Sequence, residues 1–187
     1  MEVHLIRHTT VDVQKGICYG QSDVDVSDTF IQEAAALRLK LDQDYECIYS
    51  SPLKRCTLLA NQLNLGETRI DSRLKEINFG TWELKEWNDI DSSSLTKWHE
   101  NIVHFNDYSG ESLLVFQYRV QSFLQELLKC KGEKVMIVTH AGVIRLFYQF
   151  VMEFPLENMM KLPVQFGMNH VFEIDKNKSL CYIKDIR

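Results

Sequence analysis

The sequence lacks the features of exported, membrane-spanning and nucleic-acid-binding proteins. Its N-terminus has no basic region followed by a long apolar segment, and no window reaches the roughly 18–20 apolar residues of a membrane span. The formal net charge is −5, with 21 Lys+Arg against 26 Asp+Glu, and there is no basic run of the kind that nucleic-acid binders carry. We therefore expect a cytoplasmic protein with neither a membrane nor a nucleic acid among its partners.

Metal and cofactor motifs are also absent. The five cysteines form an odd, scattered set without a C-x-x-C spacing, which argues against a disulfide framework and a zinc knuckle and favours a reducing compartment. The sequence contains no H-E-x-x-H motif and no glycine-rich phosphate loop of the P-loop or dinucleotide-binding kind. We therefore expect no metal and no cofactor.

The chain has the length and composition of one ordinary globular domain, which we expect to span residues 1–187. Strand-like runs alternate with helical periodicities, which favours a three-layer α/β/α fold with a mainly parallel central sheet. The aromatic segment 84–108 is expected to form one or two short helices, as a helical cap over the sheet edge. Strands are expected from Val3 to Arg7, at 47–50, at 68–70, from Val135 to His140, and as a hairpin of 169–175 and 180–184 joined through 176–179; helices are expected at 28–41, 52–65, 111–130 and 142–152.

Two of these predicted strands end at a histidine. His8 follows the first strand directly after Arg7, and His140 ends the apolar run that begins at Val135. In open α/β sheets, ligands bind outside the carboxyl ends of the strands. If the two strands are neighbours, both histidines face one pocket.

A third strand end adds an arginine to this edge. Ser51 as N-cap and Pro52 at the first helical position predict a helix start directly after the strand at 47–50. This start places Arg55 in the first turn, beside the positive end of the helix dipole, where an arginine is unfavourable unless an anion is present. Together with Arg7, the strand ends supply two arginines and two histidines, which predicts a site for an anion, and phosphate is the anion that we expect.

Four motifs follow one another in order along almost the whole chain, namely residues 5–9 (LIRHT), 50–55 (SSPLKR), 74–83 (LKEINFGTWE) and 139–142 (THAG). Together they resemble the histidine phosphatase superfamily, which has the phosphoglycerate-mutase-like fold. One Arg-His pair would be a weak signal, whereas four ordered motifs are a strong one. The resemblance implies a metal-independent phosphatase that works through a phosphohistidine.

The chemistry of phosphoryl transfer explains why these residue types are needed, because it asks the protein mostly for positioning and charge neutralisation. A neutral imidazole at a strand end can attack phosphorus, and we expect His8 to be the nucleophile. Arg7 and Arg55 would present forked donors to the phosphate oxygens. By resemblance, His140 is a further phosphate contact, and the backbone N–H of Ala141 would add another donor.

The acid that protonates the leaving alkoxide, and later deprotonates water, is expected to be Glu76. This role requires a pKa raised by burial, for which the apolar side chains that follow Glu76 are suitable neighbours. Glu83 and Glu111 are rival acids. The segment 109–112 is either a helix N-terminus or part of the site.

The sequence departs from the family pattern directly after the nucleophile. Thr9 stands where the family usually has glycine, so that either its hydroxyl donates to the ligand or the loop is shifted. Gln14 occupies roughly the position of a polar residue that usually contacts the phosphate further along this loop.

The substrate is a separate question, and we expect a small-molecule phosphate ester. The segments 18–24 (CYGQSDV) and 109–112 (SGES) are most similar to those of α-ribazole-5′-phosphate phosphatases of cobalamin nucleotide-loop assembly. The alternatives are a sugar-phosphate phosphatase or phosphoglycerate mutase of the same fold, and a non-catalytic phosphate-binding module. The short chain favours hydrolysis over the mutase reaction. The sequence leaves the oligomeric state open.

Overall fold

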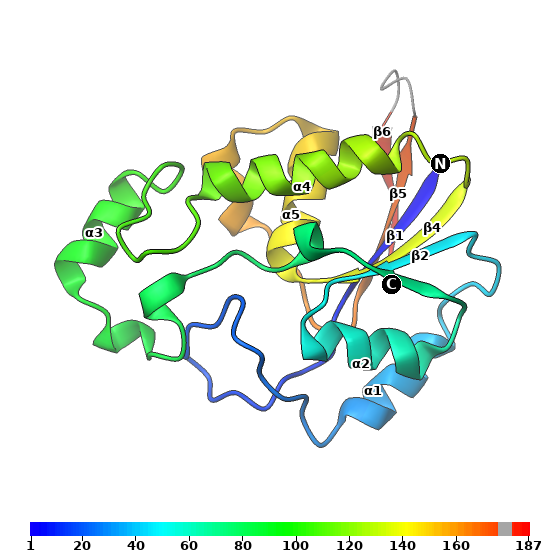
Figure 1. The fold of residues 1–187 in the computed structure, drawn as a ribbon, viewed down its shortest axis with the longest axis horizontal. Coiled ribbons are helices and arrows are strands. Elements are labelled where there is room, and N and C mark those ends of the chain that lie inside the picture. The colour runs from blue at the N-terminus through cyan, green and yellow to red at the C-terminus, as the bar shows by residue number, and fades with distance from the viewer. Residues whose placement is uncertain (176–180) are drawn as a thin grey trace.

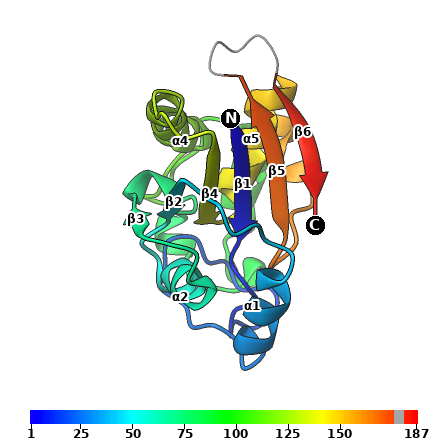
Figure 2. The same cartoon turned by 90° about the vertical axis from the view of Figure 1, so that its right-hand side faces the viewer.

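A six-stranded sheet runs through the centre of the protein (Figure 2). The computed structural model describes residues 1–175 and 181–187, and its strands lie in the order β3-β2-β4-β1-β5-β6. The first four of these strands are parallel, whereas β5 and β6 are antiparallel to their neighbours. The prediction of a mainly parallel sheet is therefore confirmed. The strands are β1 (Glu2–Arg7), β2 (Cys47–Ser50), β3 (Thr68–Ile70), β4 (Lys134–Thr139), β5 (Asn169–Ile174) and β6 (Cys181–Ile186).

Helices cover both faces of this sheet, as predicted for a three-layer fold. In Figure 1, α4 and α5 lie above the strands, and α1 and α2 lie below them. Each face has its own apolar core, because alternate residues of a strand point to opposite sides. In β1, Leu5 packs with the core under α4 and α5, and Ile6 packs with the core under α1 and α2. The helices are α1 (Phe30–Arg38), α2 (Lys54–Leu63), α3 (Ser92–Glu100), α4 (Leu113–Leu127) and α5 (Ala141–Met152).

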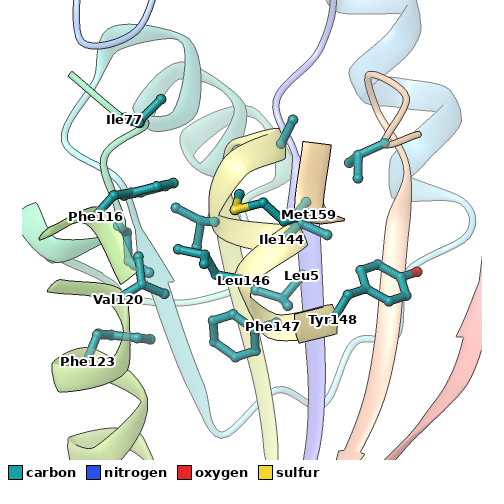
Figure 3. Close-up of a cluster of buried hydrophobic side chains, with 14 of the residues drawn as sticks. Leu5, Ile77, Phe116, Val120, Phe123, Ile144, Leu146, Phe147, Tyr148 and Met159 are labelled. Carbon is teal, nitrogen blue, oxygen red and sulfur yellow. The ribbon is translucent and has the colours of Figure 1, made fainter. Parts of the chain in front are cut away.

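The larger core lies between α4, α5 and the sheet (Figure 3). Phe116, Val120 and Phe123 project from one side of α4 toward the apolar face of α5. All three are almost fully buried. Their spacing of three and four residues follows the helical period, and this stripe fixes the orientation of α4 against the sheet.

Several predicted helix ends are wrong. The helix expected from Pro52 with Ser51 as its N-cap begins at Lys54, after Leu53 as N-cap. It ends at Leu63, because Asn64 adopts a left-handed conformation with φ of 48° before Gly66 is reached. The helices predicted at 28–41 and 111–130 are shortened to α1 and α4, and α4 starts after Ser112, whose hydroxyl caps it.

The segment 84–108 contains a 3-10 helix (Trp87–Asp89) and α3, and it lies at the end of the molecule away from the strands (Figure 1). Within the segment, Trp98 of α3 stacks on Trp87 with ring centroids 5.9 Å apart. Trp98 also contacts the buried Trp82, which attaches the segment to the body. Further 3-10 helices lie at Ser72–Leu74, Gly80–Trp82 and Leu156–Lys161.

Two further predictions concern the chain as a whole. The strands of the predicted closing hairpin are present as β5 and β6, while its connection at 176–179 lies outside the described residues. None of the helices formed by residues 1–175 and 181–187 has the length and apolar character needed to cross a bilayer.

Candidate active site

His8 lies at the carboxyl end of β1, in the interior of the sheet. Its backbone N–H donates to the carbonyl oxygen of Thr139, the last residue of the neighbouring β4, at 3.0 Å. The side chain is 2% exposed, and its Nδ1 lies 2.8 Å from the carbonyl oxygen of Thr9. Because a carbonyl oxygen can only accept, Nδ1 carries the proton and Nε2 keeps its lone pair. His8 is thus held in the tautomer that a nucleophilic imidazole needs.

The surroundings of His8 also keep it neutral. Burial lowers the pKa of His8 well below its usual value, and the positive charges of Arg55 and Arg7 act in the same direction. The imidazole is therefore neutral at pH 7, and its Nε2 can form a bond to phosphorus.

Arg7, His8 and Arg55 line one cavity of about 280 Å³. Arg55 is fully buried, and its guanidinium donates from Nη1 to the carbonyl oxygen of Ser22 at 2.9 Å and from Nη2 to that of Gly20 at 2.7 Å. These two bonds tie α2 to the loop that follows β1. They fix the plane of the guanidinium beside His8.

The side chain of Arg7 is held by the segment that precedes β5. Its Nη1 donates to the carbonyl oxygen of Val164, and its Cζ lies 3.7 Å from the ring centroid of Phe166, a cation–π contact. The Nε atoms of Arg7 and Arg55 are buried and have no hydrogen-bond partner among the described residues. Two oriented guanidinium groups with spare donors suit a ligand that carries several acceptor oxygens.

His140 follows β4 and is the N-cap of α5. Its ring centroid lies 5.2 Å from that of His8, so the two strand ends bring the histidines together as predicted. His140 Nε2 lies 2.8 Å from the hydroxyl of Ser51. Burial lowers the pKa of His140 well below its usual value, and Arg55 adds to the effect. The same hydroxyl accepts from the backbone N–H of Leu53 at 3.3 Å, so Ser51 joins His140 to the turn before α2.

Glu76 lines the same cavity as His8. One carboxylate oxygen, Oε2, accepts from the backbone N–H of Gly142 at 3.1 Å, and Oε1 accepts from that of Ile77 at 3.0 Å. The first of these bonds joins Glu76 to the N-terminal turn of α5, directly after His140. The carboxylate of Glu76 and the imidazole of His8 therefore share one cavity.

The two rival acids have other partners. Glu83 accepts from the backbone N–H groups of Gln21 and Phe79, at 2.9 and 3.0 Å. Glu111 forms an ion pair with Arg119, with 2.6 Å between Oε2 and Nη2. Neither residue lines the cavity, whereas Glu76 does.

Three further residues were predicted to contact the phosphate, and they lie at different distances from the cavity. Ala141 lines the cavity. Thr9 is fully buried beside His8, and its hydroxyl has no hydrogen-bond partner among the described residues. Gln14 is exposed and is not among the residues that line the cavity. The structure thus brings Ala141 to the cavity and buries Thr9 next to His8, and neither Thr9 nor Gln14 is among the residues that line the cavity.

Two residues that line the cavity, Tyr19 and Arg145, were not predicted from the sequence. The ring of Tyr19 lies 5.5 Å from Cζ of Arg55. Arg145 projects from α5 and donates from Nε to the carbonyl oxygen of Leu162 at 2.8 Å. A signal was present for Arg145, because it is the one charged residue in the otherwise apolar α5, four residues after Ala141.

A smaller apolar chamber adjoins the cavity and shares Tyr19, Glu76, Phe79, Arg145 and Met160 with it. Among its lining residues, Arg145 is the one cation and Glu76 the one carboxylate. Figure 3 shows that three of the chamber residues, Ile77, Phe116 and Met159, belong to the buried cluster between α4 and α5. The rest of its lining is Trp98, Ile102, Leu113 and Gly142.

A group with the spacing of metal ligands lies elsewhere, at Glu2, His4 and Asp42. These residues lie at the amino end of β1, opposite His8. The amine of Lys134 bonds to Asp42 at 2.8 Å, and the amine of Lys184 bonds to Glu2. Lysine amines thus already compensate these carboxylates, and the group contributes nothing to the cavity at His8.

Comparisons with known proteins identify the family and the fold of this chain. The family model described as "Histidine phosphatase superfamily (branch 1)" matches residues 3–183. Phosphoserine phosphatase 1 of Hydrogenobacter thermophilus is 30% identical over 77% of this chain and 72% of its own length. An adenosylcobalamin/alpha-ribazole phosphatase of Escherichia coli is 25% identical over 94% of this chain and 91% of its own.

The crystal structure of the alpha-ribazole phosphatase from Shigella flexneri superposes with a TM-score of 0.89 at 24% identity, covering 98% of this chain and 95% of the other. At this identity the likeness concerns the fold.

Proposed function

The chain belongs to the histidine phosphatase superfamily (branch 1) and is a phosphatase, and we propose that it is a metal-independent phosphomonoesterase that works through a phosphohistidine on His8. The observation that carries the proposal is the state of His8: buried, neutral, with Nδ1 protonated and Nε2 free, between two oriented guanidinium groups. An arrangement of this kind supplies a nucleophile and charge neutralisation without a metal ion.

The reaction has two steps. In the first, Nε2 of His8 forms a bond to phosphorus while the bond to the ester oxygen breaks, and Glu76 gives its proton to the leaving alkoxide. In the second, Glu76 takes a proton from water, whose oxygen attacks phosphorus, and the bond to Nε2 breaks. Free phosphate and neutral His8 remain. Arg7 and Arg55 neutralise the phosphoryl oxygens throughout, because their guanidinium groups are already oriented by protein acceptors.

Three further groups complete the proposed phosphate site. The neutral His140 and the backbone N–H of Ala141, at the N-terminus of α5, contribute donors to the equatorial oxygens. The buried hydroxyl of Thr9 donates to the ligand, which accounts for its lack of a protein partner. Gln14 is left out of this set because it is exposed, whereas Thr9 and His140 are buried next to His8.

Residues 1–187 would act as one domain, and the segment 84–108 would be its cap. The leaving group would occupy the apolar chamber. Trp98 of this segment lines the chamber together with residues of α4 and α5. An apolar chamber favours a leaving group with a flat, uncharged part, because burying an unpaired charge there is unfavourable. We therefore assign α-ribazole-5′-phosphate as the substrate, in agreement with the activity named for the Escherichia coli relative.

Phosphoserine is the second candidate. A relative at 30% identity is named a phosphoserine phosphatase. Arg145, which faces both the cavity and the chamber, is a group that could pair with the carboxylate of the serine part.

The test is phosphate release from α-ribazole-5′-phosphate, phosphoserine, 3-phosphoglycerate, a sugar phosphate and a nucleotide, with chelator present. We expect α-ribazole-5′-phosphate to be hydrolysed fastest and the activity to survive the chelator. His8→Ala should abolish it, whereas His104→Ala, which changes an exposed histidine, should not. A strict requirement for added divalent metal, or phosphorus bound covalently to another side chain after an alkaline quench, would refute the mechanism. Isomerised ester in place of free phosphate would indicate a mutase.

A further inference from the structure

The loop that carries Glu76 is held almost entirely by side chains. Residues 73 and 74 end a short 3-10 helix, and residues 75 and 76 follow it. None of the four belongs to a strand, so their carbonyl groups have no ladder partners. Each of the four carbonyl oxygens nevertheless accepts a hydrogen bond from a side chain of another element. The hydroxyl of Thr139 donates to the carbonyl of Leu74 at 2.8 Å, and Arg119 of α4 donates to those of Arg73, Lys75 and Glu76.

Arg119 uses every donor of its guanidinium group here. Nη1 donates to the carbonyl oxygens of Arg73 at 2.8 Å and Lys75 at 2.9 Å, and Nη2 donates to that of Glu76 at 3.1 Å. The other two N–H groups, on Nε and Nη2, bind the two carboxylate oxygens of Glu111 at 2.7 and 2.6 Å. A guanidinium group has five N–H donors, so none is left over.

Glu111 closes this arrangement from the other side. Its Oε2 also accepts from the backbone N–H of Asn78 at 3.0 Å, and its own backbone N–H donates to the carbonyl oxygen of Asn78 at 2.8 Å. Gln21 adds a donor to the carbonyl oxygen of Glu76 at 3.0 Å. The side chains of Arg119 and Glu111 are only 19% and 16% exposed, so the pair is partly shielded from water.

We propose that Arg119, oriented by Glu111, is a positioning residue for the general acid Glu76. It fixes the backbone on both sides of Glu76, so that the carboxylate stays on the N–H of Gly142 and within the cavity. The inference rests on the proposed function, because it needs Glu76 to act on the leaving oxygen. It also gives Glu111 a role other than that of a rival acid.

Esters with different leaving groups distinguish a misplaced general acid from a general loss of activity. Nitrophenolate leaves without being protonated, whereas the alkoxide of an alkyl phosphate needs the acid. We measure kcat/KM, which reports the first phosphoryl transfer to His8, for p-nitrophenyl phosphate and for the alkyl phosphate that is hydrolysed fastest in the panel above. The variants are Glu76→Gln, Arg119→Ala and Arg119→Lys.

Arg73→Ala is the matched control. Arg73 also links this loop to α4, through an ion pair with Glu126 at 2.8 Å, but its side chain gives no donor to the carbonyl of Glu76. Melting temperatures of all variants monitor the fold.

Glu76→Gln should lower kcat/KM for the alkyl ester by about 10²–10⁴-fold and leave the nitrophenyl ester nearly unchanged. Arg119→Ala should show the same selectivity at roughly 10- to 100-fold, the size expected for an acid misplaced by about 1 Å. Arg119→Lys should lose part of the alkyl-ester activity, since an ammonium has fewer donors and no planar fork. Arg73→Ala should affect both esters by less than about threefold.

The inference would be overturned if the Arg119 variants lost kcat/KM equally for both esters, or lost none. In that case a Glu76→Gln variant that loses activity only toward the alkyl ester would still support the proposed function. If Arg119→Ala does not fold, Arg119→Lys decides the question alone, and an unchanged ratio between the two esters refutes the positioning role. A Glu76→Gln variant that loses both esters equally would refute the assigned role of Glu76 itself, and the inference with it.

Discussion

Gly142→Ala should disable the proposed acid without touching the nucleophile. Gly142 is the second residue of α5, and its backbone N–H donates to Oε2 of Glu76. A Cβ atom at this position would lie 2.1 Å from Oε1 of Glu76 and 2.9 Å from Cε1 of Phe116. The first distance is far below ordinary van der Waals contact, so the carboxylate must leave its place.

The size of the effect follows from these distances. To reach ordinary contact, which begins at 3.4 Å, Oε1 of Glu76 must move by more than about 1 Å, and a displacement of that size costs roughly 10²-fold in rate. This factor corresponds to about 2.7 kcal/mol of transition-state stabilisation. Overpacking against Phe116 costs about 1–3 kcal/mol of folding stability, whereas alanine in place of glycine in a helix returns up to about 1 kcal/mol.

The assay is kcat/KM for an alkyl phosphate and for p-nitrophenyl phosphate, with the melting temperature measured alongside. We expect a selective loss for the alkyl ester of about two orders of magnitude. The control is Gly132→Ala, where the nearest atom, Sγ of Cys47, lies at an ordinary 3.4 Å. A folded Gly142→Ala variant with unchanged alkyl-ester activity would refute the placement of Glu76 as the acid.

Two further predictions concern buried polar groups. Arg55→Lys should raise the inhibition constant of inorganic phosphate by at least about tenfold and lower stability by about 1–3 kcal/mol, because lysine cannot satisfy the carbonyls of both Gly20 and Ser22 while binding phosphate; unchanged phosphate inhibition would contradict the assigned contact. Burial lowers the pKa of His170 to about 4, so between pH 6.5 and 4 the unfolded chain binds a proton that the folded chain does not. Stability is therefore full above pH 6.5 and falls below it, and His170→Gln should reduce the slope of unfolding free energy by about 1.4 kcal/mol per pH unit between pH 6 and 5; an equal slope in urea titrations of both proteins would contradict this.

The sequence predicted the sheet and the ends of its central strands well. The apolar runs before His8 and His140 have the length of buried strands, and parallel strands end at the same edge of a sheet. The register pairs Arg7 with Thr139, so the two histidines that follow lie beside each other. Local patterns therefore predicted that His8 and His140 lie side by side.

Helix ends were predicted less well, because local capping signals compete with tertiary partners. Ser51 carries a good N-cap signal, yet its hydroxyl lies 2.8 Å from Nε2 of His140 and the helix begins three residues later, at Lys54. The hydroxyl also accepts from the backbone N–H of Leu53 at 3.3 Å, so the local turn and the bond to His140 share it.

The sequence by itself determined which residue types end each strand, because the burial and periodicity of a strand depend on residues that are close together in the sequence. Only the tertiary structure decided which of three glutamates faces the cavity, since that depends on the ion pair of Glu111 with Arg119 and on the N–H of Gly142. It also decided that Arg145 reaches the cavity from α5. These contacts join residues far apart in the chain, and hydrogen-bond geometry between distant elements leaves no periodic signal in the sequence.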